Sequence, residues 1–472
     1  MDDATQRKAA SASRRARIDL LLLFLILATA LLLRVSPLLG GLEAQRNGLG
    51  PFGDSWAYHA IGYNLAQGNG YSMTDFGGAK GLGVNPPDPQ LYLPAATRAP
   101  LYPIFLAGIY KANGLTGQLS ALQMQMTFRL VRVIQAILDT ATCLMLFLLA
   151  RLLTPRWQLP ALFSAAIYAT SPYHGYFSGA ILTETLASFL AVAAILVTTR
   201  AMRDVCSWAF GAGGILWGLL ALCRPEYLIL SVTLAVVLAV VHWRRSVRFT
   251  PVLALVAGIA LAVAPWIARN QTTFGSPFIS VGGLGYNLFW GSFEGRHPLR
   301  KWDELPKEIF LHPNEHQQAQ LLVDDFLSAS RQGSVAIRTI DQQFFDLAVE
   351  RIRADPAGTL ADWILKLPRL GYQDRHPLYR DPEPHGAYAL ACLILGAIGA
   401  FVLWRRRVSW ALPAMAFVPL VWLMYLPLHV EPRYGLPMLA VVIAFAGVGS
   451  GVLWSTLASL RRGSPMIPPH GP

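Results

Sequence analysis

The sequence predicts an all-α polytopic membrane protein with about ten transmembrane helices and two external loops that carry interfacial helices. The first observation is composition: the 472 residues are 54% hydrophobic and 14% charged, with a mean hydropathy of +0.41, whereas roughly a quarter of the residues in soluble domains are charged. The second is the recurrence of apolar runs of about 20 residues, the length that a helix needs to cross a bilayer. The third is the regular placement of basic clusters between these runs.

The apolar runs predict ten spans. They cover residues 18 to 40, 130 to 150, 158 to 176, 183 to 199, 207 to 223, 225 to 242, 250 to 267, 386 to 404, 409 to 428 and 435 to 457. With ten spans, every basic cluster falls on one side, namely residues 7–17, 151–156, 200–203, 244–248, 405–407 and 461–462. Both termini are therefore predicted to be cytoplasmic. The first run is too long for a signal-peptide core and ends without a small-residue cleavage site, so we interpret it as a retained signal anchor.

The same basic clusters explain much of the net charge of +12, because cytoplasmic loops face anionic lipid. Nucleic acid is therefore not an expected partner, whereas the lipid bilayer is. The four cysteines, Cys143, Cys206, Cys223 and Cys392, lie in or beside spans. Their spacing predicts neither a disulfide framework nor a zinc site.

The predicted spans divide the chain into five parts. A basic cytoplasmic tail (1–17) precedes spans one to seven (18–267), which include an external loop at 41–129. An external region with interfacial helices (268–385) follows, then spans eight to ten (386–460) and a second cytoplasmic tail (461–472). The two external segments are too long to be simple connectors, so we expect function there. Apolar residues recur at helical spacing in 340–353 and 360–370, which predicts helices along the membrane surface.

This topology gathers ionisable residues at the external ends of the spans. Such residues cost several kcal/mol at membrane depth unless they are paired or face water, so each is a candidate for function. The set comprises Asp54, Arg98, His174, Glu184, Arg224, Glu226, Arg269, His429, Glu431 and Arg433. A carboxylate can take a proton from an acceptor hydroxyl, and guanidinium groups match phosphate geometry. Aromatic side chains at Trp56, Tyr58 and Tyr63 can stack on a sugar, so the set fits sugar transfer from a lipid phosphate.

Several of these candidates also have a purely structural interpretation. Asp54 follows Gly53 at the start of a helical run, as a helix N-cap does. His174 fits an interface histidine with satisfied hydrogen bonds. Arg224 with Glu226, and Glu431 with Arg433, fit local ion pairs at span ends. The convergence of all these residues on one face favours a functional site.

Motifs spread over most of the chain carry a family resemblance. They are Gly53-Asp54 with Tyr58 and residues 64–72, then 98–103, 178–179 with 183–185, 265–270 with 274–275, 283 with 287–288, 348–356 with 366–367, and 431–437. In this order they resemble the bacterial membrane glycosyltransferases of the dolichyl-phosphate-mannose-protein mannosyltransferase family. The resemblance implies a GT-C fold. It also implies inverting transfer of a sugar from a polyprenyl-phosphate donor to a glycan, lipid or protein acceptor. The reaction would occur at the outer face of the bacterial cytoplasmic (inner) membrane, with the site facing the periplasm or exterior.

The resemblance also implies roles for particular residues. Asp54 takes the position of the catalytic aspartate, which acts as general base or arranges donor and acceptor. Arg98, Glu184, Arg269 and Arg433 would bind substrate. The predicted topology adds His174, His429 and Glu431 to these binding candidates, and the aromatic run after Asp54 adds Tyr58. Ser55 follows Asp54 where some relatives carry a second acidic residue. This departure leaves the need for a divalent metal, Mg²⁺ or Mn²⁺, open.

Two other functional classes remain alternatives. A transporter or flippase of lipid-linked sugars would need charges along a route through the bundle, and Asp139 in the second span is the chief charge at the centre of a predicted span. A noncatalytic scaffold would bind partners through its loops. The crowding of arginines and carboxylates on one face favours the enzyme over both.

Overall fold

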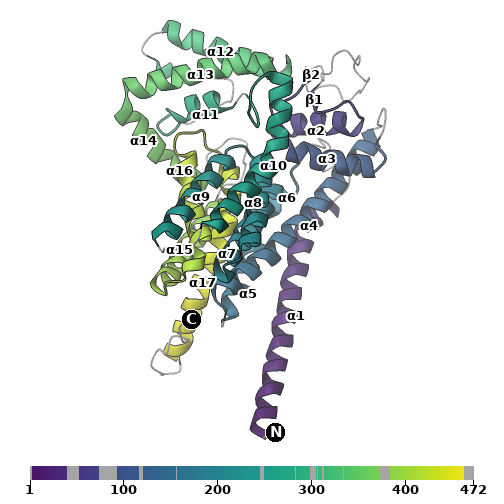
Figure 1. The fold of residues 1–472 in the computed structure, drawn as a ribbon, viewed down its shortest axis with the longest axis vertical. Helices are drawn as coiled ribbons and strands as arrows, with labels where there is room; N and C mark the ends of the chain where they lie inside the picture. Colours follow the sequence, from purple (N-terminus) through teal and green to yellow (C-terminus); the bar gives the residue numbers. More distant parts are fainter. Residues whose placement is uncertain are drawn as a thin grey trace.

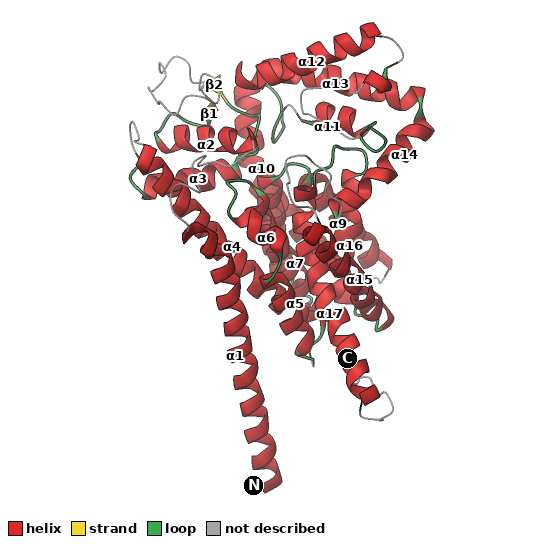
Figure 2. Cartoon of the chain, turned by 180° about the vertical axis from the view of Figure 1, so that it is seen from behind, coloured by secondary structure: helices red, strands yellow, loops and turns green. Residues whose placement is uncertain are grey.

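The computed structural model describes residues 3–39, 53–73, 93–115, 121–155, 157–244, 249–281, 283–297, 305, 307–310, 313–332, 334–371 and 383–461. A bundle of helices is covered at one end by a second layer of helices, most of them shorter, as Figures 1 and 2 show from opposite sides. This layer, called the short-helix layer below, comes from the described parts of residues 53–112 and 284–370. Each predicted span overlaps at least one helix. The prediction of an all-α polytopic membrane protein is therefore confirmed.

The bundle consists of the helices that correspond to the predicted spans. They are α1 (Asp3–Leu39), α4 (Ala121–Leu153), α5 (Leu159–Ala169), α7 (Glu184–Asp204), α8 (Ser207–Cys223), α9 (Tyr227–Arg244), α10 (Thr250–Phe274), α15 (Glu383–Arg405), α16 (Leu412–Tyr425) and α17 (Leu436–Arg461). Within the described ranges, six of them contain stretches long and apolar enough to cross a membrane, in α1, α4, α7, α10, α15 and α17. The other four are shorter apolar helices.

The described ends of the chain lie on one side of the bundle. Helix α1 begins and α17 ends opposite the short-helix layer (Figure 1). This arrangement agrees with an even number of crossings, as the basic clusters predicted. The C-terminal tail beyond Arg461 lies outside the described residues.

Helix α17 is the centre of the bundle. Of its most apolar stretch, 83% is buried inside the protein, against 17% for α1. Glycines allow the close approach: a Cβ at Gly447 would lie 2.0 Å from Ser164 Oγ on α5, and one at Gly449 would lie 2.1 Å from the Leu395 carbonyl on α15. Small residues at such crossings are how membrane helices pack tightly without a hydrophobic driving force between them. The sequence of α17 is apolar on all sides because it contacts helices on all sides.

The predicted span 158–176 is wrong in one detail, because it contains two helices. Helix α5 ends at Ala169, and α6 (Pro172–Ser178) begins after an extended Ser171 with ψ of 115°. The Ser171 side chain accepts a hydrogen bond from the backbone N–H of His174 and caps α6. Pro172 has no N–H to continue α5 and disfavours helical geometry in the residue before it. The Ser-Pro pair therefore ends one helix and starts the next.

The short-helix layer has two parts. The first contains α2 (Gly53–Ala66), α3 (Leu101–Ala112) and an antiparallel pair of two-residue strands, β1 (Ser72–Met73) and β2 (Leu93–Pro94). The second contains α11 (Leu284–Gly291), η3 (Lys307–Ile309), α12 (Pro313–Gln332), α13 (Ser334–Ala354), α14 (Pro356–Lys366) and η4 (Leu367–Leu370). Two more 3₁₀ turns, η5 (Ser409–Ala411) and η6 (Pro432–Gly435), precede α16 and α17.

The helices predicted at 340–353 and 360–370 are present as α13 and as α14 with η4. Protein covers the apolar face of the first, and the placement of these helices along the membrane surface stays a prediction. Phe344 and Ala348 are fully buried in a separate core with Phe289 of α11 and Phe326 of α12. Helix α13 thus uses its apolar stripe to pack against its neighbours.

Candidate functional site

Asp54 lies in the first turn of α2, where the partial positive charge of the helix N-terminus favours a carboxylate. Helix α2 packs closely on α3, since a Cβ at Gly62 would lie 3.0 Å from Leu106 Cβ and 3.1 Å from the Pro103 carbonyl. This packing brings Arg98, just before α3, to Asp54. Arg98 Nη2 donates to Asp54 Oδ1 over 2.6 Å.

A second arginine reaches Asp54 from the far end of the sequence. Arg433 of η6 donates from Nη2 to Asp54 Oδ2 over 2.9 Å. Both carboxylate oxygens of Asp54 therefore bind a guanidinium. The Asp54 side chain is 34% exposed and that of Arg98 29% exposed, against 8% for Arg433. The Asp54–Arg98 pair thus forms the open edge of an otherwise buried cluster.

Glu184 and Arg224 form the floor of the cluster. Glu184, the first residue of α7, lies with Oε1 3.4 Å from Arg224 Nη1 and 3.6 Å from Arg433 Nη1. Arg224 also binds Glu226 over 2.8 Å, and the Tyr425 hydroxyl donates to Glu226 over 2.7 Å. The predicted Arg224–Glu226 pair is present, and it forms part of the larger network.

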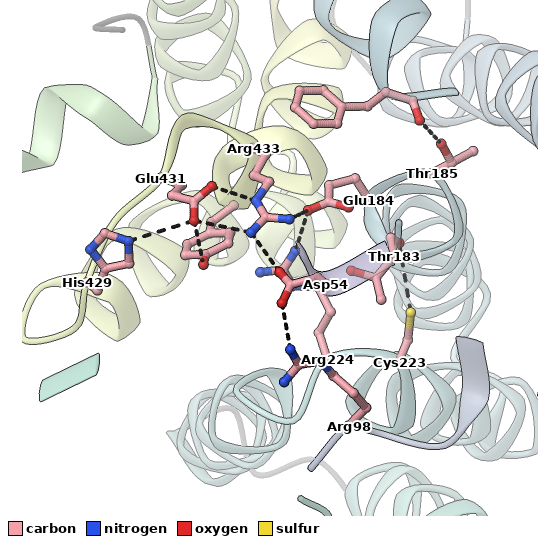
Figure 3. A network of polar contacts seen from close by, with 12 residues as sticks. Asp54, Arg98, Thr183, Glu184, Thr185, Cys223, Arg224, His429, Glu431 and Arg433 are labelled. Carbon is pink, nitrogen blue, oxygen red and sulfur yellow. Dashed lines mark hydrogen bonds and ion pairs between the residues drawn. The ribbon is translucent and has the colours of Figure 1, made fainter. Parts of the chain in front are cut away.

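His429 and Glu431 precede η6 and line its other side. Arg433 Nε donates to Glu431 Oε2 over 2.6 Å, so the predicted local pair is also present. Figure 3 shows Arg433 directed between Glu431 on one side and Asp54 and Glu184 on the other. The His429 ring lies with Nε2 3.8 Å from Glu431 Oε1. Arg433 therefore connects the cluster by contacting three carboxylates.

The electrostatics outside the membrane spans follow from these contacts. Burial disfavours the charged form of Asp54, but Arg98 and Arg433 outweigh burial and hold its pKa below the ordinary value. Burial likewise opposes protonation of His429, yet nearby carboxylates raise its pKa to about 9. Asp54 is thus an anion and His429 a cation at neutral pH.

Tyr58 lies beside the open edge. The Arg98 guanidinium carbon is 5.7 Å from the centre of the Tyr58 ring, within the range of a cation–π contact. The ring also packs edge-on against Tyr102, at 5.2 Å between centroids. Tyr58 therefore packs against Arg98. Burial raises the pKa of the Tyr58 hydroxyl.

Two predicted binding residues make their contacts elsewhere. His174 is buried, packs 4.4 Å from the Tyr168 ring, and hydrogen-bonds Ser171 and the Leu436 carbonyl. Arg269 donates to the carbonyls of Ala95 and Tyr71, so it holds the segments next to β1 and β2. The structure does not bring either side chain into contact with Asp54.

Sequence reasoning missed three residues that join the cluster from the second part of the short-helix layer. Glu294 contacts His429 over 2.9 Å, Arg369 contacts Glu294 over 2.8 Å, and Lys366 is fully buried next to them. One signal was available for Glu294, because it directly follows the apolar and aromatic run 288–293. A charge at the end of such a run is a candidate buried partner.

The donor set gives little support to a divalent metal. Among the residues that the structure describes, no group of three or more His, Cys, Asp or Glu side chains could hold a metal ion. The carboxylates of Asp54, Glu184 and Glu431 each face an arginine instead. We therefore assign no step to a metal.

Comparison with known proteins gives a match to one family model over about a third of the chain, and a similar fold. Residues 117–268 match the family model described as dolichyl-phosphate-mannose-protein mannosyltransferase, which confirms the resemblance predicted from the sequence. This segment includes Glu184 and Arg224 but excludes Asp54, Arg98 and Arg433. No curated protein matches the chain.

Solved structures of similar fold include the oligosaccharyltransferase of Archaeoglobus fulgidus. Its apo form has a TM-score of 0.55 at 14% sequence identity, with 94% of this chain and 51% of that chain covered. The same enzyme tethered to an acceptor peptide has a TM-score of 0.53 at 13% identity, with 94% and 50% covered. The chain thus has the same fold over about half the length of that enzyme.

Proposed function

Because its residues 117–268 match the dolichyl-phosphate-mannose-protein mannosyltransferase family and its fold is that of a membrane oligosaccharyltransferase, we propose that this protein is an inverting glycosyltransferase. It moves a hexose or pentose from a polyprenyl-phosphate donor to a glycan, lipid or protein acceptor. The reaction occurs at the outer face of a bacterial cytoplasmic membrane. In this proposal the tails 1–17 and 461–472 are cytoplasmic, and the regions 41–129 and 268–385 lie outside.

The observation that carries the proposal is the position of Asp54 between two arginines at the end of a membrane bundle. A polyprenyl-phosphate sugar has a long apolar chain and a single phosphodiester charge. The bundle supplies apolar surface for the chain, and Arg98 and Arg433 supply paired donors for the phosphate at its end. A carboxylate beside that phosphate is suited to deprotonate an attacking hydroxyl.

The two arginines have a second role in this mechanism. In the substrate-free protein they lower the pKa of Asp54 despite its burial, which makes Asp54 a weak base. A donor phosphate competes for the same guanidinium groups, so the pKa of Asp54 rises when the donor binds. Asp54 then takes the proton of the acceptor hydroxyl as that oxygen attacks the anomeric carbon. The bond from this carbon to the phosphate oxygen breaks, and the arginines stabilise the charge of the departing polyprenyl phosphate.

The test is turnover with a panel of donors. Purified protein in liposomes is incubated with polyprenyl-phosphate sugars and candidate acceptors, with and without chelator, and released polyprenyl phosphate is measured by mass spectrometry. Asp54→Asn removes the base and should lower turnover by about 10²- to 10⁴-fold. Asp204→Asn, an exposed carboxylate at the cytoplasmic end of α7, is the matched control and should retain full turnover. Unchanged turnover in Asp54→Asn would remove Asp54 as the base.

The transporter alternative loses its main support. Asp139 on α4 is buried and bonded to Arg34 on α1, and the Tyr168 hydroxyl donates to it over 2.5 Å. The three side chains satisfy one another within the membrane region. Asp139 is thus explained as part of a helix-to-helix connection.

A further inference from the structure

A chain of ion pairs runs from the short-helix layer to Asp54. Glu294 lies just after α11, and its Oε2 is 2.9 Å from His429 Nδ1. On the other side of the imidazole, Nε2 lies 3.8 Å from Glu431 Oε1. Glu431 binds Arg433, which donates to Asp54 over 2.9 Å. Three side chains therefore connect Glu294 to the proposed catalytic base.

Glu294 is itself held by several parts of the fold. Arg369 of η4 donates to Glu294 Oε1 over 2.8 Å and to its carbonyl over 3.1 Å. The Val430 N–H donates to Glu294 Oε2 over 3.3 Å, so this oxygen binds both the backbone and the imidazole of the segment 429–430. The carboxylate thus joins α11, η4 and the segment that leads to Arg433.

Lys366 reinforces the same junction. It is fully buried at the end of α14, and its ammonium donates to the Gly291 carbonyl over 2.8 Å and to the Leu428 carbonyl over 2.6 Å. One carbonyl ends α11 and the other directly precedes His429. The second part of the short-helix layer therefore binds the segment 428–433 at two points, through Lys366 at Leu428 and through Glu294 at residues 429–430.

The charges along the chain alternate in sign. Arg369, His429 and Arg433 carry positive charge, and Glu294, Glu431 and Asp54 carry negative charge. The side chains of Glu294, His429 and Glu431 are each less than 5% exposed. Buried charges require compensating neighbours, so loss of one charge changes how its partners are held. Glu294 and Glu431 face the imidazole from opposite sides, the Tyr434 ring packs edge-on against it, and Lys366 and Arg369 lie beyond Glu294.

On the basis of the proposed function, we propose that Glu294 is a positioning residue for sugar transfer. It acts through His429 and Glu431 to orient the Arg433 guanidinium toward Asp54 and the donor phosphate. The short-helix layer thereby contributes to the reaction without contacting the reacting atoms.

The test compares three variants by steady-state kinetics across pH. Glu294→Gln keeps the shape and the acceptor oxygen but removes the charge, whereas Glu294→Asp keeps the charge. Glu350→Gln removes an exposed carboxylate from α13 and is the matched control. We expect Glu294→Gln to lower kcat by between about ten- and a hundredfold. We also expect the alkaline limb of the pH–rate profile of Glu294→Gln to move by about one pH unit or more toward acid. The reason is that His429 has lost one of the two carboxylates that favour its protonated form.

Glu294→Asp should restore most of the wild-type kcat and bring the alkaline limb of the pH–rate profile close to its wild-type position. Glu350→Gln should match the wild type in both. A purely structural role would lower the rate evenly at every pH and leave the limb in place. That result, or an unchanged kcat in Glu294→Gln, overturns the proposal.

A second measurement needs no turnover. Histidine-labelled protein in detergent reports the titration of His429 by NMR, with the signal assigned by its loss in His429→Gln. A fall of about one unit in the His429 pKa in Glu294→Gln supports the connection, and an unchanged pKa overturns it. If the wild type releases polyprenyl phosphate from no donor while the His429 pKa falls as expected, the proposed function fails and the Glu294–His429 connection stands.

Discussion

Arg433 and Asp54 are separated by 379 positions in the sequence, and their side chains meet over 2.9 Å. This contact joins the start of α2 to the turn before α17, the central helix of the bundle. It fixes the open edge of the cluster to the most buried element of the fold. The position of the proposed base therefore depends on packing throughout the bundle.

Replacement of Arg433 by lysine should impair the site although the charge is retained. The planar guanidinium contacts Asp54, Glu184 and Glu431 in one geometry, which an ammonium cannot reproduce. Loss of one charge-assisted hydrogen bond of about 1.5 kcal/mol corresponds to an approximately tenfold lower kcat/KM. Kinetics of Arg433→Lys beside Arg203→Lys, an arginine in the last turn of α7 far from the cluster, provide the measurement. Equal kcat/KM for wild type and Arg433→Lys would show that the fork geometry is not required.

The stability of the protein should depend on pH through His429. Burial opposes its protonation, but Glu294 and Glu431 raise its folded-state pKa to about 9, above its ordinary value of about 6.5. Its contribution is therefore fully present below about pH 6.5 and is lost as pH rises through about 9, with a size of up to about 3 kcal/mol. His429→Gln should unfold at a lower temperature than wild type at pH 6, and the difference should shrink by pH 10.

Lys366 acts in the opposite direction over part of this range. Burial lowers its pKa to about 7, so its folded form binds fewer protons than the unfolded form between about pH 7 and pH 10, and stability rises with pH there. Since wild type and His429→Gln both contain Lys366, the difference between their thermal unfolding curves isolates His429. A difference that is constant from pH 6 to pH 10 would contradict the assigned ion pairs.

The Arg34–Asp139 pair should support stability without taking part in transfer. Asp139→Asn leaves the Arg34 guanidinium buried in the membrane region without its carboxylate, and breaking such a pair costs about 3–5 kcal/mol. A second substitution, Arg34→Met, removes the stranded cation and should restore much of the unfolding temperature in detergent. Sugar transfer by Asp139→Asn at low temperature should match the wild type. A selective loss of transfer with normal stability would instead place Asp139 in the functional pathway.

Part of this protein is determined by the sequence alone. Apolar runs must become helices in lipid because only helices satisfy their own backbone there, so the spans follow from composition. Basic clusters place alternate loops on opposite sides, so the gathering of Asp54, Arg98, Glu184, Arg224, Glu431 and Arg433 at one end was predictable. The local pairs of Arg224 with Glu226 and of Glu431 with Arg433 followed from spacing of two residues. These features depend on the periodicity of apolar residues, on the side of the membrane that each loop occupies, and on contacts between residues close in sequence.

Only the tertiary structure decided which of these residues meet. From membrane sidedness, His174 and Arg269 are also expected at this end of the bundle. Helix packing, however, directs His174 toward Tyr168, and Arg269 toward the carbonyls of Tyr71 and Ala95. The contact of Glu294 with His429 depends on how α11, α14 and η4 dock on the bundle, which is set by side-chain packing rather than by local pattern. A charge is placed on one side of a membrane by its own segment, but it acquires its partner from segments far away in the chain.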